Sequence, residues 1–328
     1  MKAHALRGFL FLGAATFSLP LLGLAPSPPQ FEFVPSYFPA QPGDQPIGAA
    51  HGGVAVDRAG NVYVSTDTDR GILVFGPSGK FSRSFGPTQI HGLFLQREHG
   101  VDYLYCARPN FNEVEKLRLD GSVVWKMGYP EKSGIYANAG EFHPTNVVAT
   151  PDGTIFVADG YGKKWIHKYT ADLTYVKSFG GPGSVTPAEE GKFNTCHGLT
   201  VDNRGPKPLL FVCNRESGRV EHWDTDGNFL GVLVRDLRMP AAVQIRGDYV
   251  AIAELQGRVT VLDKENKIVA QLGDNPDPKQ RANYGLAPSA WTDGVFNSPH
   301  GISFDRSGSI VVSEWSQYGR ISKFALKR

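Results

Sequence analysis

Three histidines stand at the same point of a recurring phrase in this 328-residue chain, namely His91, His197 and His300. Each is followed by a glycine and then by an apolar run. The neutral imidazole of histidine is the commonest metal ligand in proteins. Three protein ligands that leave a fourth position open are typical of a catalytic zinc site. The spacing therefore predicts a zinc ion held by these three side chains, if the fold brings the three copies of the phrase together.

The phrase recurs six times, and these repeats are the elements that must position the histidines. Copies begin near residues 50, 90, 143, 196, 239 and 299, and each contains an apolar strand, a turn and a second strand. Two more strands follow in most copies, and a repeat of about 40 to 60 residues with four short strands is typical of a β-propeller blade. We predict an all-β, six-bladed β-propeller over residues 49–328. The three histidines then lie on alternate blades, about 120° apart around one axis.

Two further histidines stand near the same point of their copies. His51 opens the first copy at the phase of the three histidines, so it is a candidate fourth ligand, a hydrogen-bond donor to a ligand, or a residue that merely suits the start of a blade. His143 opens the third copy, but Pro144 follows it, and we expect its ring to point elsewhere.

The last copy stops after its third strand, which would leave an edge of unpaired backbone groups that sheets normally cover. The segment Phe31-Glu32-Phe33-Val34 alternates apolar and polar residues as a strand does. We predict that residues 26–48 form a linker and a closing strand, and that this strand completes the sixth blade.

The chain begins with two basic residues, Lys2 and Arg7, and an uncharged apolar run from Gly8 to Leu24. This pattern predicts that residues 1–25 are a secretory signal peptide or an uncleaved membrane anchor, so that the protein is periplasmic or extracellular. The net charge of +2 and the dispersed Lys and Arg residues argue against a nucleic-acid partner. We expect a monomer that binds a small-molecule or peptide substrate.

The three cysteines are an odd number, so at least one has no partner within the chain. Cys196 and Cys213 fall on adjacent strands of one blade and are the only reasonable pair. The alternative is that these two and Cys106 are all small buried apolar side chains.

The end of each second strand is the other place from which a side chain can reach the axis. Long connections at residues 129–141, 181–192 and 274–296 border the same mouth. The positions aligned there are Asp67, Arg108, Tyr161, Arg215, Glu254 and Trp315, with Glu314 beside the last. The arginines, the tyrosine and the glutamates among them, together with the three histidines, are more ionisable groups than a packed channel needs.

Parts of the chain resemble peptidylglycine α-amidating lyase, a family within the NHL-repeat propellers. The similar segments are Phe142–Tyr161, Cys196–Leu199, Asn214–Arg219 and Ser298–Ile302. The resemblance implies a channel zinc held by His91, His197 and His300, and cleavage of a peptidyl α-hydroxyglycine into a peptide amide and glyoxylate. It also implies that Tyr161 is the base that takes the hydroxyl proton, and that Arg215 binds the substrate carboxylate.

The chain departs from the family pattern at two informative places. Asp67 stands where the family has a second arginine, and we expect Arg108 to substitute for it at the mouth. Gly301 stands where the family has an acid that helps to bind a structural calcium, which leaves calcium open.

Two other functions fit a propeller of this kind. One is a non-catalytic exported NHL propeller that binds a peptide or glycan at its mouth. The other is a calcium-dependent lactonase-type propeller, for which Glu254, Glu314 and Asn146 could supply ligands. Tyr161 together with three phased histidines favours the zinc-dependent lyase, because a binding module needs neither.

Overall fold

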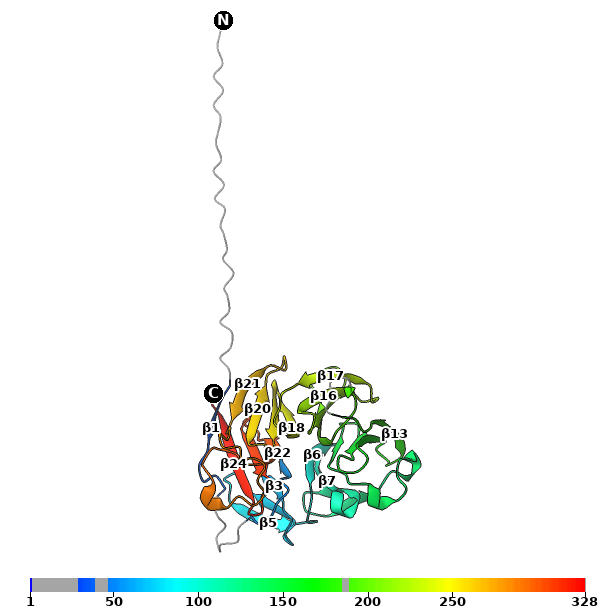
Figure 1. Ribbon diagram of the computed structural model, residues 1–328, viewed down its shortest axis with the longest axis horizontal. Helices are drawn as coiled ribbons and strands as arrows, with labels where there is room; N and C mark the ends of the chain where they lie inside the picture. Colours follow the sequence, from blue (N-terminus) through cyan, green and yellow to red (C-terminus); the bar gives the residue numbers. More distant parts are fainter. Residues whose placement is uncertain (2–28, 39–46, 185–188, 328) are drawn as a thin grey trace.

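The chain forms a ring of six four-stranded antiparallel sheets, which is the predicted six-bladed β-propeller (Figure 1). The computed structural model describes residue 1 and residues 29–38, 47–184 and 189–327. The inner strands contact their neighbours in the closed cycle β2–β6–β10–β14–β18–β22–β2. These six strands surround a central channel.

Each blade takes four strands that follow one another along the chain, apart from the last blade, which borrows β1. The first three blades contain β2 (Val54–Val56), β3 (Val62–Ser65), β4 (Ile72–Phe75), β5 (Phe81–Phe85), β6 (Gly92–Glu98), β7 (Val101–Arg108), β8 (Glu113–Arg118), β9 (Val123–Met127), β10 (Asn146–Ala149), β11 (Ile155–Ala158), β12 (Trp165–Tyr169) and β13 (Tyr175–Gly180). The other three contain β14 (Cys196–Asp202), β15 (Leu209–Asn214), β16 (Arg219–Asp224), β17 (Phe229–Val234), β18 (Pro240–Arg246), β19 (Tyr249–Glu254), β20 (Arg258–Leu262), β21 (Ile268–Leu272), β22 (Pro299–Phe304), β23 (Ile310–Glu314), β24 (Arg320–Lys327) and β1 (Gln30–Phe33). The described connections also contain the short 3₁₀ helices η1 (Pro109–Phe111), η2 (Glu131–Ser133), η3 (Ala139–Glu141) and η5 (Pro288–Ala290).

The predicted closing strand is confirmed. β1 pairs antiparallel with β24, so that Phe31 lies opposite Leu326 and Phe33 opposite Phe324. The rings of Phe33 and Phe324 also contact edge to face, with their centroids 5.6 Å apart. The N-terminal strand therefore covers the outer edge that the last blade would otherwise expose.

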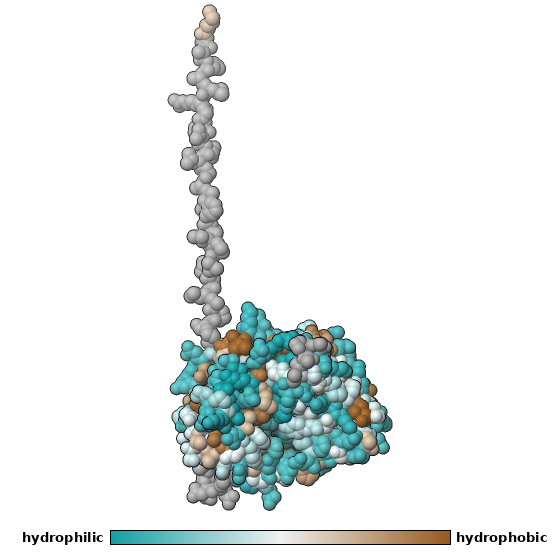
Figure 2. All heavy atoms as spheres, viewed as in Figure 1, coloured by the Kyte–Doolittle hydropathy of each residue, from teal (hydrophilic) through white to brown (hydrophobic). Residues whose placement is uncertain are grey.

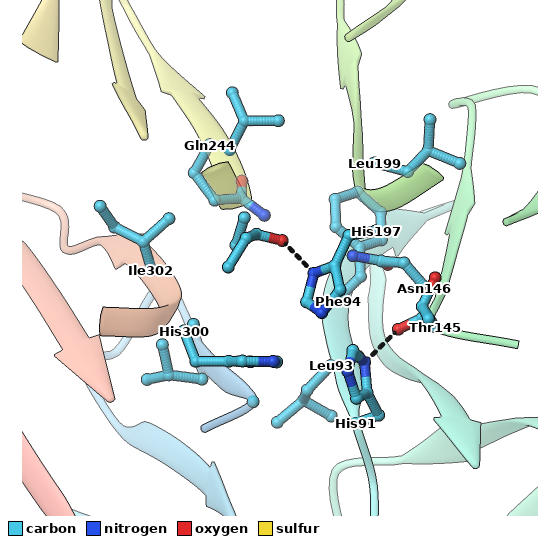
Figure 3. A pocket seen from close by; sticks show the side chains of 17 residues that line it. His91, Leu93, Phe94, Thr145, Asn146, His197, Leu199, Gln244, His300 and Ile302 are labelled. Atoms are coloured by element: carbon cyan, nitrogen blue, oxygen red, sulfur yellow. Dashed lines mark hydrogen bonds between the residues drawn. The ribbon is translucent and has the colours of Figure 1, made fainter. Parts of the chain in front are cut away.

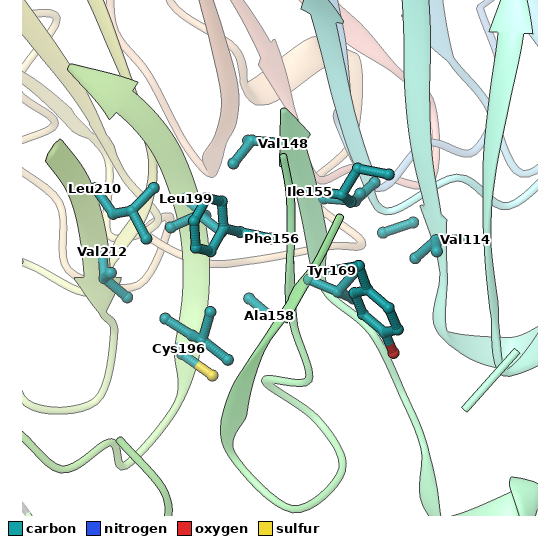
Figure 4. Packing of buried hydrophobic residues seen from close by; sticks show 14 of the residues in the cluster. Val114, Val148, Ile155, Phe156, Ala158, Tyr169, Cys196, Leu199, Leu210 and Val212 are labelled. Atoms are coloured by element: carbon teal, nitrogen blue, oxygen red, sulfur yellow. The ribbon is translucent and has the colours of Figure 1, made fainter. Parts of the chain in front are cut away.

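Apolar side chains between the faces of neighbouring blades form the core. Figure 4 shows the packing of the third and fourth blades, where Phe156 of β11 belongs to one cluster with Leu199, Leu210 and Val212. All four are at most 1% exposed. Val, Ile and Phe suit such positions because branched and aromatic side chains pack well on a pleated surface. This packing holds the inner strands, and hence the channel, at fixed positions.

The cysteine pair proposed from the sequence does not form. Cys106, Cys196 and Cys213 are all free and buried. Opposite Cys196 in the sheet lies Asn214, whereas Cys213 lies opposite Gly198. Burial raises the pKa of all three thiols, so they behave as small apolar residues.

The face of the ring shown in Figure 2 is largely hydrophilic, and its apolar residues lie in small separate spots. Among the described residues, no helix is long and apolar enough to cross a membrane. The predicted signal peptide or anchor falls almost entirely on residues 2–28, which lie outside the described part of the chain.

Candidate metal centre

The structure brings the three phased histidines together on the channel axis (Figure 3). The ring centroids of His91, His197 and His300 are 4.6 to 4.8 Å apart. One ring nitrogen from each lies within 4.8 Å of the other two, and all three residues are buried. Three buried histidines in this arrangement could bind a metal ion.

Irregular pairing at the start of the inner strands aims two of these rings at the axis. In β14, Cys196 and Gly198 pair with consecutive residues of β15, so His197 is the extra residue of a β-bulge. In β22, His300 is the extra residue between Pro299 and Gly301. A bulge turns the side chain of its extra residue away from the regular alternation of the strand.

Carbonyl oxygens of the next blade fix the tautomer of two histidines. His91 Nδ1 lies 2.7 Å from the Thr145 oxygen, and His197 Nδ1 lies 2.7 Å from the Ala241 oxygen (Figure 3). A carbonyl oxygen can only accept, so each Nδ1 carries the hydrogen and each Nε2 keeps its lone pair. Metal-binding histidines usually have their second nitrogen held in this way.

The glycine after each histidine allows this close approach between blades. A Cβ on Gly92 would lie 2.4 Å from the Thr145 oxygen, and one on Gly198 would lie 2.4 Å from the Ala241 oxygen. A Cβ on Gly301 would meet the Gly52 oxygen in the same way. In each His-Gly pair, the histidine is the candidate ligand and the glycine leaves room for the carbonyl of the neighbouring blade.

The cluster keeps its histidines uncharged. Burial and, to a lesser extent, the nearby His51 together lower the pKa of His91 to about 3. Burial also lowers the pKa of His197 and of His300 well below the usual value. Neutral imidazoles are the form that binds a metal ion, so the donor set fits a cation at neutral pH.

Tyr161 and Arg215 complete the cluster. The Tyr161 hydroxyl lies 3.0 Å from His91 Nε2 and 3.0 Å from His197 Nε2, and it accepts a 3.0 Å hydrogen bond from Arg215. Its single hydrogen can serve only one of the two Nε2 atoms, so the other lone pair is left for another partner, as a metal ion would provide. Glu216 holds the Arg215 guanidinium through bonds of 2.9 and 2.6 Å.

The hydroxyl end of Tyr161 lies inside the cluster, although the residue as a whole is 41% exposed. Burial raises the pKa of Tyr161, and the charge of Arg215 opposes this shift. Gly160 makes the position possible, because a Cβ there would lie 2.6 Å from the Cys196 oxygen.

His51 lies beside the triad but not at the equivalent position. The residue that occupies the place of His300 in the first blade is Gly52, whose carbonyl meets Gly301 as the Thr145 carbonyl meets Gly92. His51 therefore stands one residue earlier. Its Nδ1 bonds Asp67 at 2.8 Å, and its ring centroid is 5.8 Å from that of His91 and 6.5 Å from that of His300.

Arg108 does not replace the family's second arginine. Its guanidinium bonds Glu113 at 2.5 Å and Glu115 at 2.6 Å, and it lies over the ring of Phe111. Two carboxylates of its own blade thus already balance its charge. The expectation that Arg108 serves substrate at the mouth is corrected for this reason.

The two glutamates predicted near the mouth are structural. Glu254 accepts bonds from the side chain of Arg258 and from the backbone of Arg238, and Glu314 accepts two 2.7 Å bonds from the backbone of Asn297 and Ser298. Both carboxylates anchor the segment that enters an inner strand. They are therefore not free to bind calcium at the axis.

Trp315, a predicted mouth residue, and His143 make their contacts outside the triad. Trp315 packs against Tyr284, with ring centroids 4.9 Å apart. His143 Nδ1 bonds the Pro109 oxygen at 2.9 Å, so its ring points elsewhere, as expected from the proline after it.

Comparisons with known proteins agree with the fold and give a local sequence match. No family model matches the chain. Peptidyl-glycine alpha-amidating monooxygenase A of Xenopus laevis is 35% identical over 91 residues, which are 26% of this chain and 9% of that protein. The chain thus matches only a small part of that protein's length.

Among solved structures, a streptogramin B lyase matches 92% of this chain and 98% of its own, with a TM-score of 0.60 and 16% identity. Virginiamycin B lyase from Staphylococcus aureus matches 91% and 100%, with a TM-score of 0.57 and 15% identity. At these identities the likeness establishes the six-bladed propeller fold alone.

Proposed function

We propose that this chain is a zinc-dependent lyase of the amidating type, which cleaves a carbinolamide into an amide and glyoxylate. The observation that carries the proposal is the position of the Tyr161 hydroxyl, 3.0 Å from two histidine Nε2 atoms and 3.0 Å from the Arg215 guanidinium. The 91-residue match to an amidating monooxygenase and the lyases among the structural neighbours support it.

The residues of the chain divide the work as follows. His91, His197 and His300 would hold the zinc ion through their inward nitrogens. Bound zinc would supply a Lewis acid that polarises the oxygens of the substrate. Arg215 would bind the substrate carboxylate with charge-assisted hydrogen bonds. Its charge also favours the phenolate form of Tyr161, against the effect of burial.

The proton balance of the reaction closes within the site. The Tyr161 phenolate would take the proton of the carbinol hydroxyl, the carbon–nitrogen bond would break, and the carbon would become the aldehyde of glyoxylate. The departing amide nitrogen needs one proton, and Tyr161 then holds one to return. Neither oxidant nor reductant is required.

Export of the protein as a monomer is part of the proposal. The basic start and the apolar run of residues 8–24 support export, and the hydrophilic face in Figure 2, with only small apolar spots, supports a monomer.

The proposal is tested by measuring the bound metal and the reaction together. Purified protein should contain about one zinc per chain, by the three-ligand argument. With α-hydroxyhippurate it should release glyoxylate and benzamide in equal amounts, above the rate of a blank without protein. Chelator-treated protein should be inactive until zinc is restored. If fully loaded protein releases no glyoxylate from several such carbinolamides, the lyase proposal is refuted.

A further inference from the structure

A second cavity, of about 530 Å³, lies at the end of the channel opposite the histidines; we call it the rear cavity. His91 directly precedes β6 and Arg97 lies near its end, about 20 Å further along at roughly 3.3 Å per residue. The space beside the histidines is about 20 Å³, room for about one water molecule. A space of about 130 Å³ lies between it and the rear cavity. The rear cavity and the space beside the histidines have no lining residue in common.

Arginines line the rear cavity, one from each of four consecutive blades. They are Arg58, Arg97, Arg246 and Arg306. All lie at or near the turn from the first to the second strand, where the fourth blade has Arg204, so five of the six repeats carry an arginine there. The guanidinium group suits two-pronged binding of carboxylate or phosphate better than the lysine ammonium does.

The acids of the rear cavity leave most of this charge unbalanced. Asp102 pairs with Arg97 at 3.1 Å. Asp57 accepts bonds instead from Asn61, at 2.8 Å, and from the hydroxyl of Tyr63, at 3.0 Å. One arginine out of the four therefore has a carboxylate partner.

The other three arginines line the same cavity, are exposed to solvent and lack a carboxylate partner among the described residues. Within the part of the chain that the structure describes, Arg58, Arg246 and Arg306 form no ion pair. The Arg246 guanidinium donates instead to the backbone oxygen of Arg306, which ties two of them to one side of the cavity. Three positive groups around one cavity repel one another, and a bound anion would offset this repulsion.

We propose that the rear cavity binds a small soluble polyanion with at least two phosphate or carboxylate groups. Three unpaired guanidinium groups require two or three negative charges on one molecule. A volume of about 530 Å³ lies within the usual range for small-molecule sites. The site is independent of the lyase proposal, because it shares no residue with the metal centre.

The experiment is calorimetric titration of the zinc-loaded protein with pyrophosphate and, separately, with propane-1,2,3-tricarboxylate, at matched ionic strength. We expect saturable binding of at least one probe. Arg58→Gln and Arg306→Gln should each weaken it by about tenfold, the usual worth of a charged hydrogen bond. Arg118→Gln is the matched control, because Arg118 ends the third strand of the second blade and does not line the cavity.

An anionic probe can also bind to the zinc ion, and His197→Ala, which should lose that ion, distinguishes the two binding sites. This variant should keep the binding that Arg58→Gln and Arg306→Gln weaken. The proposal is overturned by an absence of saturable binding, by equal losses in Arg118→Gln and the two cavity variants, or by loss in His197→Ala alone. Binding to phosphatidylglycerol vesicles without binding of either soluble probe would also overturn it, since the partner would then be a membrane surface.

Discussion

Replacing Tyr161 by phenylalanine tests the chemistry most directly, because it removes one oxygen and leaves the ring. In the structure that oxygen contacts His91, His197 and Arg215 at 3.0 Å each. General base catalysis is usually worth about 10²- to 10⁴-fold in rate, or about 2.7 to 5.4 kcal/mol of activation free energy. We expect kcat for glyoxylate release to fall within this range.

Zinc content should not change in Tyr161→Phe, because the three histidine nitrogens stay in place. The assay is therefore glyoxylate release per bound zinc, followed as a function of pH. Wild-type kcat should rise with pH until Tyr161 ionises, and the phenylalanine variant should lack this rise. Tyr284→Phe is the matched control, since Tyr284 packs on Trp315 rather than on the triad.

The KM of the variant separates two roles of the hydroxyl. Loss of a proton acceptor lowers kcat with little effect on KM, whereas loss of a binding contact raises KM. If zinc-loaded Tyr161→Phe keeps full kcat, Tyr161 is not the base, even though the lyase activity itself would stand.

Further predictions concern the metal, pH, ring closure and Arg108. His197→Ala should lose its zinc on desalting while His143→Ala keeps it, as measured by elemental analysis. Because the pKa of His91 lies near 3, zinc affinity should change little from pH 7.5 to 5.5, whereas three histidines with ordinary pKa values would lose about a thousandfold. The unfolded chain takes up protons below about pH 6.5, so the melting temperature of zinc-free protein should fall as the pH drops from 7 to 4. Deleting residues 26–36 should lower the melting temperature by roughly 10 °C, because the deletion removes two half-buried phenylalanines and the pairing of β1 with β24. An unchanged melting curve would contradict the closing role. Arg108→Met should destabilise the fold by about 1.5 to 3 kcal/mol in urea unfolding, because buried Glu115 loses the guanidinium and keeps only the Lys126 ammonium, and leave kcat/KM of the folded protein unchanged.

The repeats were sufficient to predict the architecture. Four short strands per repeat, repeated six times, are typical of the blades of a closed ring. The strand missing from the last blade could be supplied by residues 31–34, which alternate apolar and polar side chains. Alternate copies of one phrase must then lie at the same height in the channel. For this reason His91, His197 and His300 could be brought together from spacing alone.

Side-chain direction at the ends of the second strands could not be read in the same way. Asp159 bonds the backbone of His143 at 2.7 Å, as Glu254 and Glu314 bond the backbone in their own blades. These residues occupy equivalent anchoring positions, and Tyr161 reaches the triad only because it comes two residues after Asp159. An alignment that treats Tyr161 and Glu254 as equivalent therefore mixes an anchor with a site residue.

The support that the following blade gives to the histidines could not be predicted from the sequence. His91 and His197 each have an acceptor for Nδ1, which is a backbone carbonyl of the following blade, at Thr145 for His91 and at Ala241 for His197. Every residue type has a backbone carbonyl, so the identities of Thr145 and Ala241 do not reveal this role. His51 stands one residue before the equivalent position of its own blade and takes Asp67 as its partner instead.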